Sequence, residues 1–318
     1  MANYLVTGGA GFIGSNLTNF LAKENHVVAV DDLSMGKMEN LDSSANIEFI
    51  KGSITDVSLM RNLLKEKEFD YIFHLAAIAS VADSVENPIR THQVNFDAVF
   101  HLLELTKKHQ KMLKRFVFSS SAAVYGDEKT LPKQEESVIR PLTPYAIDKF
   151  AAEKFVLMYN NLYEVPTSVV RFFNVYGPKQ NSSSPYSGVI SIMMECFDKL
   201  KGNLDAEFTL FGDGQQSRDF VFVEDVIQAL LLVAGNSATL GDVYNLGIGQ
   251  ATTLLELIRI IENHLGIKLP IIYKEARFGD IKESFADISK LQAIGYKPKN
   301  TVSEGMKKYI EYLQKEYE

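Results

Sequence analysis

The chain of 318 residues is long enough for about two domains, and 46% hydrophobic with 23% charged residues is the composition of an ordinary globular protein. Its net charge of −7 argues against a nucleic-acid partner, and no apolar run approaches the ~20 residues of a membrane helix. A single cysteine, Cys196, forbids an intramolecular disulfide, and a strand-like run begins at residue 4, so we expect a cytoplasmic protein with no signal peptide and no membrane partner.

In the first 173 residues, short runs rich in β-branched and aromatic residues alternate with longer runs of helical periodicity. The short runs lack strict polar alternation, which indicates a parallel sheet buried on both faces by crossover helices. We therefore predict a Rossmann-like, doubly wound α/β domain. Strands are expected at 4–7, 27–31, 47–50, 71–76, 116–119 and 167–172, and helices at 12–24, 55–67, 92–109 and 146–163.

After residue 173 the regular alternation of strand-like and helix-like runs ends, although 223–235 and 242–247 still fit one more helix and strand of the first domain. Thr253 and Glu256 have the spacing of a capping box at the start of an amphipathic helix. Other elements are expected as a loop at 177–188, helices at 189–201 and 252–266, and a strand at 208–211. We predict a Rossmann domain from 1–173 and 218–247, and a smaller, interleaved α/β substrate lobe from 174–217 and 248–318.

Four glycines, Gly8, Gly9, Gly11 and Gly14, lie between the first strand and the first helix. Glycines in this place permit a tight turn, let backbone N–H groups approach a pyrophosphate and let the helix pack closely on the strand. A P-loop is excluded because Ser15-Asn16 follows Gly14 where a P-loop has Lys-Ser/Thr. The stretch therefore predicts a dinucleotide site; a merely tight turn is the alternative.

The second strand ends in Asp31-Asp32. A carboxylate at that position can accept both ribose hydroxyls of an adenosine and would repel a 2′-phosphate. This favours NAD over NADP, with Asp31 as the contact and Asp32 as its neighbour.

Two further stretches carry chemistry: Ser119-Ser120-Ser121 at a strand end, and Tyr145 with Lys149 in the first turns of a helix. Tyr145 and Lys149 are four residues apart and so share one helix face. A phenol has a pKa of about 10, but a nearby ammonium and a nicotinamide cation favour the phenolate. A serine hydroxyl can steady the substrate oxygen and relay its proton. The alternative is a chance pairing of tyrosine and lysine on one helix.

As a set, these motifs identify the chain, over essentially its whole length, as similar to extended short-chain dehydrogenases/reductases, and in particular to nucleotide-sugar 4-epimerases of the UDP-glucose/UDP-N-acetylglucosamine type. The resemblance implies a catalytic trio of Ser121, Tyr145 and Lys149, with Asn95 bracing the site. It also implies a tightly bound NAD that is regenerated in each turnover. The implied cofactor-binding residues are Gly8, Gly11, Phe12, Ile13, Gly14, Asp31, Asp32, Ser53, Ile54, Leu75, Ala76, Ala77, Asn95, Ser119, Tyr145, Lys149 and Phe172.

The same resemblance implies a UDP-sugar substrate. Asn174 would touch the diphosphate, Phe211 would lie beside the uracil, and two arginines, in SRDF and ARFGD, would clamp the diphosphate. Guanidinium groups suit that task because their N–H forks match phosphate oxygens. The implied substrate-binding residues are Ser121, Asn174, Val189, Phe211, Arg218, Arg277, Asp280 and Ser284.

Two positions depart from the family pattern. Many relatives have Asp where this chain has Ser53, so an uncharged hydroxyl would replace a carboxylate in the contact with adenine. A small hydroxyl residue often precedes the catalytic lysine; here it is Asp148, which we expect to face solvent.

The neighbours of Ser121 bear on the type of reaction. Similar 4,6-dehydratases carry an Asp-Glu pair where this chain has Ala122-Ala123, and similar decarboxylases carry a glutamate in that region. Without such an acid, a 4-keto intermediate is only re-reduced, so we predict an isomerase that epimerises C4. A dehydratase or reductase, and a non-catalytic NAD or nucleotide-sugar sensor, are the alternatives.

The choice of sugar rests on Ser284, which occupies the position where glucose-restricted relatives have a bulky tyrosine. A small side chain leaves room for a 2-acetamido group. We therefore expect interconversion of UDP-GlcNAc and UDP-GalNAc, with activity on UDP-Glc and UDP-Gal. A restriction to non-acetylated sugars stays open, as does a surface position for Ser284.

Three other features have plainer interpretations. The six histidines lack the spacing of metal ligands, so no metal is expected. The charged segment 127–137 predicts a solvated loop, or a partial lid. The helices at 92–109 and 146–163 carry apolar residues on more than one face, which fits either a thick core or, as the resemblance implies, a homodimer through a four-helix bundle.

Overall fold

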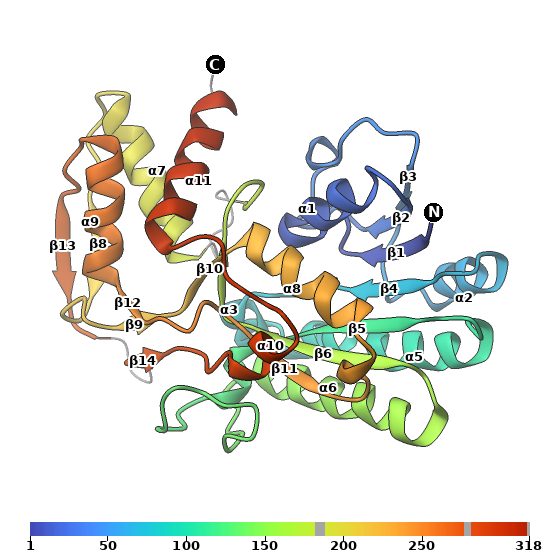
Figure 1. Cartoon of the computed structure of the whole chain (residues 1–318). Helices are drawn as coiled ribbons and strands as arrows, with labels where there is room; N and C mark the ends of the chain where they lie inside the picture. Colours follow the sequence, from blue (N-terminus) through green and yellow to red (C-terminus); the bar gives the residue numbers. More distant parts are fainter. Residues whose placement is uncertain (182–187, 277–280, 317–318) are drawn as a thin grey trace.

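The computed structural model describes residues 1–181, 188–276 and 281–316. Within these residues, seven parallel strands form the central sheet in the order β11-β6-β5-β4-β1-β2-β3 (Figure 1). The strand order reverses between β1 and β4, which is the doubly wound arrangement that the sequence predicts. The strands are β1 (Asn3–Thr7), β2 (His26–Asp31), β3 (Ile47–Lys51), β4 (Tyr71–His74), β5 (Arg115–Ser121), β6 (Thr167–Phe172) and β11 (Val243–Leu246).

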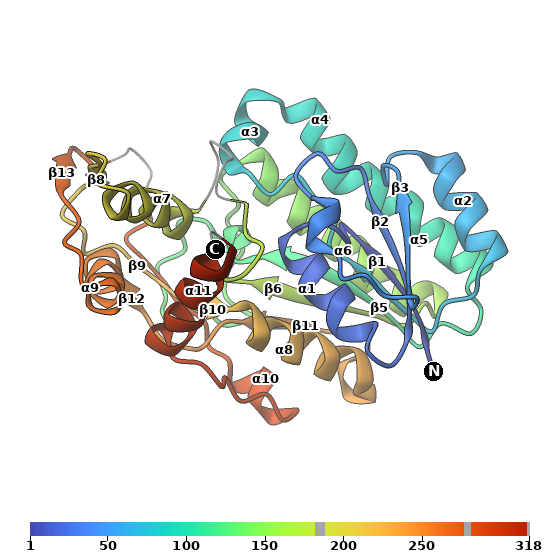
Figure 2. The same cartoon turned by 90° about the horizontal axis from the view of Figure 1, so that it is seen from above.

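Helices cover both faces of this sheet, as Figure 2 shows from above. Leu5 and Val6 are neighbours in β1 and enter different cores, because successive side chains of a strand point to opposite faces. Val6 packs in the core that includes α1 and α8, whereas Leu5 packs in the core that includes α2, α5 and α6. These helices are α1 (Phe12–Leu21), α2 (Val57–Glu66), α5 (Ala98–His109), α6 (Pro144–Tyr163) and α8 (Val223–Gly235).

A smaller lobe lies at the left of Figure 1. Its core joins Met193, Phe208, Leu257 and Met306, all buried, from three helices and a strand. The elements are α7 (Val189–Lys201), α9 (Leu254–Leu265) and α11 (Val302–Glu316), with the paired strands β8 (Phe208–Phe211) and β13 (Ile271–Lys274). Short strands connect the two lobes: β7 (Asn174–Tyr176) with β10 (Phe220–Phe222), and β9 (Ser217–Arg218) with β12 (Thr252–Thr253) and β14 (Glu283–Ser284).

The predicted elements agree closely with the structure. Each strand predicted in the first half lies within two residues of an observed strand at either end, and the capping box of α9 is confirmed. The helix expected at 92–109 is different in detail: it begins at Pro88 as α4 (Pro88–His92) and makes a π-helical turn at Gln93–Asp97 before α5, and a separate short helix, α3 (Val81–Glu86), precedes it. Among the described helices, none has both the length and the apolar composition needed to cross a lipid bilayer.

The packing of the two lobes is closely interleaved, and the division of the chain that the sequence suggests stays a prediction. Phe220 and Phe222 join the core of the smaller lobe, while Val221 between them joins the core of the large sheet. Leu291 of α10 (Ser289–Ala293) and Tyr296 also pack in the core of the large sheet.

The turn between β1 and α1 depends on two glycines. Gly8 has a φ of +69°, a conformation that costs other residues free energy, and its N–H donates to the Val30 carbonyl at 2.8 Å. A methyl group at Gly14 would overlap the carbonyl oxygen of Gly8. The helix can therefore approach the strand end only because both residues lack a side chain.

We expect Gly14→Ala to lower the free energy of unfolding by about 3 kcal/mol, because the added methyl group meets rigid backbone. Gly235→Ala is the matched control: nothing lies within 4 Å of the added carbon at this helix end, so stability should stay the same or rise by up to about 1 kcal/mol. Urea unfolding of the two variants provides the measurement. Equal stabilities would contradict this account of the turn.

Candidate active site

The predicted functional residues of the first domain gather at the carboxyl edge of the sheet. Thr7 pairs with Val30 and His74 in neighbouring strands, and Ser121 pairs with Phe172. The residues that follow these positions therefore meet at one edge, where open α/β sheets bind ligands. Those predicted for the cofactor there are Gly8, Gly11, Phe12, Ile13, Gly14, Asp31, Asp32, Leu75, Ala76, Ala77, Ser119 and Phe172.

Helix α1 presents its N-terminus to this edge. Among the described residues, no side chain caps the helix at Gly11, whereas Thr143 caps α6. The first N–H groups of a helix need a partner, and an anion is a good one because the helix dipole is positive at that end. The turn therefore has the chemistry of a pyrophosphate site.

Asp31 is buried at the end of β2. Its carboxylate accepts N–H groups from Ala10, at 3.0 Å, and from Leu33, at 2.8 Å. Burial raises the pKa of this carboxyl group, and the backbone donors oppose the rise. Asp32 is exposed and accepts the N–H of Ser34.

The residue that replaces the family's aspartate, Ser53, has its hydroxyl 2.8 Å from that of Thr55. Ser53 is half-buried beside the buried Ile54. The hydroxyl is thus held in place by a local turn, next to the strand end at which the resemblance puts the adenine.

Asn95 braces the segment that follows β4. Its side-chain oxygen accepts the Ile78 N–H and its amide donates to the Ile78 carbonyl, both at 2.9 Å. The side chain is buried in the π-helical turn, so its geometry suits fixing the loop of Leu75–Ala77. His74 at the end of β4 is fully buried, which lowers its pKa to about 3 and keeps it neutral.

The three predicted catalytic residues lie together. Thr143 accepts the Ala146 N–H and Pro144 follows it, so α6 begins at a point that brings Tyr145 to the end of β5. There Tyr145 is buried beside the Ser121 side chain, which acts to lower the pKa of the phenol. Lys149, one turn later, donates to the Ser119 carbonyl oxygen at 2.8 Å.

The electrostatics of this trio differ from the expectation. Burial raises the pKa of Tyr145, and the Ser121 side chain only partly opposes this. Burial also lowers the pKa of Lys149 to about 7. Since Lys149 is directed at Ser119, the side chains alone favour a neutral phenol rather than the phenolate that the sequence suggests.

Asp148 does not face solvent, which corrects the expectation for this position. Its side chain is 7% exposed, and its Oδ1 lies 2.7 Å from Nδ1 of His92. The reason is that α4 packs against α6 and covers this face of the helix. The aspartate beside Lys149 thus anchors a neighbouring helix.

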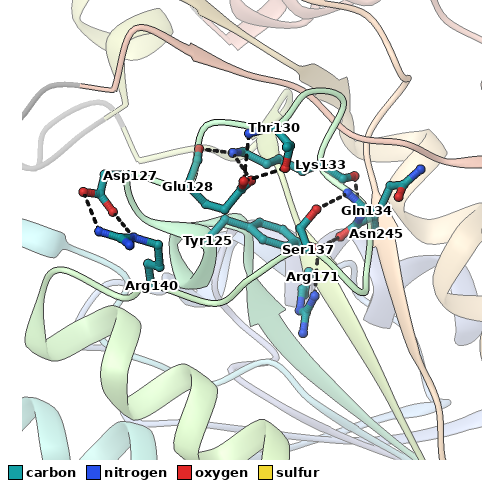
Figure 3. Close-up of polar contacts among 10 residues, drawn as sticks. All are labelled: Tyr125, Asp127, Glu128, Thr130, Lys133, Gln134, Ser137, Arg140, Arg171 and Asn245. Carbon is teal, nitrogen blue, oxygen red and sulfur yellow. Dashed lines mark hydrogen bonds and ion pairs between the residues drawn. The ribbon is translucent and has the colours of Figure 1, made fainter.

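Most side chains of the segment 127–137 are at least partly exposed, as its charges predict, but Lys133 and Glu135 are buried. Figure 3 shows Lys133 with its partners. Lys133 is 1% exposed and pairs with Glu128 at 2.8 Å. Its carbonyl oxygen accepts the side-chain amide of Asn245 at 2.8 Å, and its backbone also pairs with residues 285 and 287. The segment is therefore an ordered connection from the end of β5 to the second lobe.

A buried polar network, which the sequence did not reveal, extends from this segment to β5, β6 and α6. Arg171 binds Glu153 with two hydrogen bonds, at 2.6 and 3.0 Å, and also donates to the hydroxyl of Tyr125 (Figure 3). Glu153 accepts the hydroxyl of Ser120 at 2.9 Å. The one available signal was Arg171 between the apolar residues Val170 and Phe172 of a strand, since a buried charge requires a partner.

The substrate residues predicted on β7, β9 and β14 lie on neighbouring strands. Ser284 pairs with Arg218 in register, and the Asn174 N–H donates to the carbonyl of the residue after Arg218. Phe211 ends β8 and Val189 begins α7, both half-buried in the second lobe. Arg277 and Asp280 lie outside the described residues, so their predicted roles stay predictions.

Known proteins resemble this chain in both sequence and structure. Residues 4–247 match the NAD dependent epimerase/dehydratase family. A UDP-glucose 4-epimerase of Mycolicibacterium smegmatis is 37% identical, with 98% of each chain covered. The structure of a UDP-N-acetylglucosamine 4-epimerase from Methanobrevibacter ruminantium, in complex with UDP-N-acetylmuramic acid, is 36% identical with a TM-score of 0.92 over 99% of both chains.

A UDP-glucuronic acid 4-epimerase from Bacillus cereus, in complex with UDP-glucuronic acid and NAD, is 29% identical, with a TM-score of 0.87 over 99% of this chain and 100% of its own. The resemblance drawn from the motifs is thereby confirmed. The chain belongs to the NAD dependent epimerase/dehydratase family and is a nucleotide-sugar 4-epimerase.

Proposed function

We propose that the protein interconverts UDP-GlcNAc and UDP-GalNAc, and also UDP-Glc and UDP-Gal, through a transient 4-keto sugar with NAD retained between turnovers. The observation that carries this proposal is the burial of Tyr145 beside Ser121 at the carboxyl edge of the sheet, with Lys149 one helical turn away and bonded to the Ser119 carbonyl. The family assignment supplies the class of reaction.

The residues at the sheet edge fit NAD. The uncapped start of α1 suits the pyrophosphate, and the buried carboxylate of Asp31 suits the adenosine ribose. When bound, NAD would supply a reversible hydride acceptor and a positively charged nicotinamide ring. That charge would favour the phenolate of Tyr145, which the protein's own side chains do not.

In the proposed mechanism, Tyr145 removes the proton of the sugar's 4-hydroxyl as C4 is oxidised. Ser121, which lies beside Tyr145, steadies the same substrate oxygen. Asn174, Arg218 and Arg277 would hold the diphosphate, so the keto sugar could turn about its phosphate link and present its other face. Tyr145 then returns the proton, and C4 is restored with inverted configuration.

The surroundings of Ser121 support epimerisation over dehydration. The residues after it, Ala122 and Ala123, form a short 3₁₀ helix that continues from β5. Neither can donate or accept a proton, so the water-expelling acid and base of a dehydratase have no counterpart at these positions. Re-reduction of the 4-keto sugar is the remaining route.

Ser284 supports acceptance of the acetamido group. It lies in β14, beside Arg218 in β9, and is half-buried. A hydroxymethyl side chain next to a residue proposed for the diphosphate leaves space near the sugar that a tyrosine ring would fill.

We further propose a homodimer formed through α5 and α6. Phe96, Phe100 and Phe155 are only half-buried and pack edge to face, at 5.2 and 5.4 Å between ring centroids. A second copy of these helices would remove this aromatic surface from water.

Tyr145→Phe should lower kcat by about 10²- to 10⁴-fold, because it removes the proton acceptor, while NAD content and UDP affinity stay unchanged. Tyr176→Phe is the matched control: its buried hydroxyl donates to the Val302 carbonyl within the core of the smaller lobe, so kcat should stay near wild type. Turnover and calorimetric UDP binding are the measurements. A Tyr145→Phe enzyme with near wild-type turnover would refute the assigned role.

Ser284→Tyr should abolish turnover of UDP-GlcNAc and UDP-GalNAc while sparing UDP-Gal, since the ring fills the space for the acetamido group. Ser284→Ala should retain all four activities. Separation of the products from each UDP-sugar, without added NAD, tests both variants. A wild-type enzyme inactive on acetamido sugars would favour the glucose-restricted alternative.

Sedimentation velocity should give a mass twice the 35.6 kDa of the chain. Phe100→Asp, which puts a charge into the half-buried aromatic surface, should shift the protein to monomer. A monomeric wild type at micromolar concentration would exclude the proposed assembly.

A further inference from the structure

Asp219 lies at the point where the short strands of the two lobes meet. It follows Arg218 of β9 and precedes β10, and it is completely buried. Its N–H donates to the Ser284 carbonyl at 3.0 Å, and its carbonyl accepts the Asn174 N–H at 2.9 Å. The peptide groups of this one residue thus connect three of the residues proposed to bind the substrate.

The side chain of Asp219 binds two further segments. One carboxylate oxygen accepts the Ile248 N–H at 2.8 Å, and the other accepts those of Gly249, at 2.9 Å, and Ala286, at 3.2 Å. Ala286 is two residues beyond Ser284, and residues 248–249 lead into β12. Gly247 packs so closely on the carboxylate that an added methyl group would overlap it.

The strand that carries Ser284 is held from its other side as well. The Lys133 N–H donates to the Phe285 carbonyl at 2.8 Å, and the Asp287 N–H donates to the Lys133 carbonyl at 2.7 Å. Alternate residues of 284–287 therefore bind Asp219 on one side and the ordered segment around Lys133 on the other (Figure 3 shows Lys133). The hydrogen bonds with Asp219 therefore fix one edge of this strand.

We propose that Asp219 is a positioning residue for nucleotide-sugar binding: its buried carboxylate and peptide groups fix Asn174, Arg218 and Ser284 relative to one another. This inference rests on the proposed function, which gives those three residues the diphosphate and the sugar. Asp219 itself need not touch the substrate.

A nearby aspartate separates positioning from mere folding. Asp225 in α8 is equally buried and accepts the N–H groups of Lys299 and Asn300, at 2.8 and 3.1 Å. Its partners precede α11 and include no residue proposed for the substrate. Both aspartates hold chain segments together, but only Asp219 does so beside the substrate residues.

The test compares Asp219→Asn with Asp225→Asn in purified protein that retains its NAD. Either amide keeps one acceptor oxygen and turns an NH₂ group toward N–H donors, so both variants should unfold at lower temperature. Only Asp219→Asn should weaken calorimetric UDP binding, by 10-fold or more, and raise KM by a similar factor with kcat within about threefold of wild type. NAD absorbance and fluorescence should be unchanged in both.

Gly247→Ala provides a second variant in case Asp219→Asn does not fold, because it displaces the carboxylate without removing it. It should weaken UDP binding about threefold or more, while Gly235→Ala should not. Wild-type UDP affinity in Asp219→Asn or, failing that, in Gly247→Ala overturns the inference, as does an equal loss in Asp225→Asn. A wild-type protein that binds no UDP would instead overturn the proposed function on which the inference rests.

Discussion

The proposed chemistry depends on an ammonium group that is buried in apolar surroundings. Lys149 is buried against the ring of Phe118, and among the described residues no carboxylate pairs with it, so its pKa falls to about 7. Such a group is unfavourable when charged unless an anion or a polar ligand lies beside it. Burial raises the pKa of Tyr145, because it disfavours the charged phenolate. Both groups are therefore disfavoured in their charged forms by the same burial.

The elements that carry these two groups are fixed by a buried charge pair between Arg171 and Glu153. Glu153 lies one turn beyond Lys149 on α6, and it binds both Arg171 in β6 and Ser120 in β5. Removing either partner of a buried pair typically costs about 3–5 kcal/mol, so the pair strongly couples the helix to the strands. From Arg171 the contacts continue through Tyr125 and Asn245 to Lys133 and the second lobe. Helix α6 and the strand of Ser284 are thus parts of one connected polar framework.

Much of the fold, and the local part of the site, could be predicted from the sequence, because these depend on short-range signals. Strand and helix periodicity, the glycine turn and the four-residue spacing of Tyr145 and Lys149 are all visible within a few residues. The errors arose where a polar residue finds its partner far along the chain. Asp148 pairs with His92, 56 residues away, and Lys133 binds Asn245, 112 residues away. A charged side chain in a sequence is expected to face water, and only the tertiary packing reveals that it does not. The raised pKa of Tyr145 has the same origin, since burial is a property of the whole fold.

An epimerase must hold its substrate firmly at one end and loosely at the other, and the two lobes divide these tasks. The residues proposed for the diphosphate lie on short strands that are joined by backbone hydrogen bonds through Asp219, so they have little freedom to move relative to one another. The residues proposed for the 4-hydroxyl, Ser121 and Tyr145, belong to the other lobe and would contact a single oxygen. A sugar held only through that oxygen and its phosphate link can rotate after oxidation, because no further contact has to break. In the proposed mechanism, inversion at C4 needs this freedom of the ring, and the rigid nucleotide end would keep the reactive keto sugar bound.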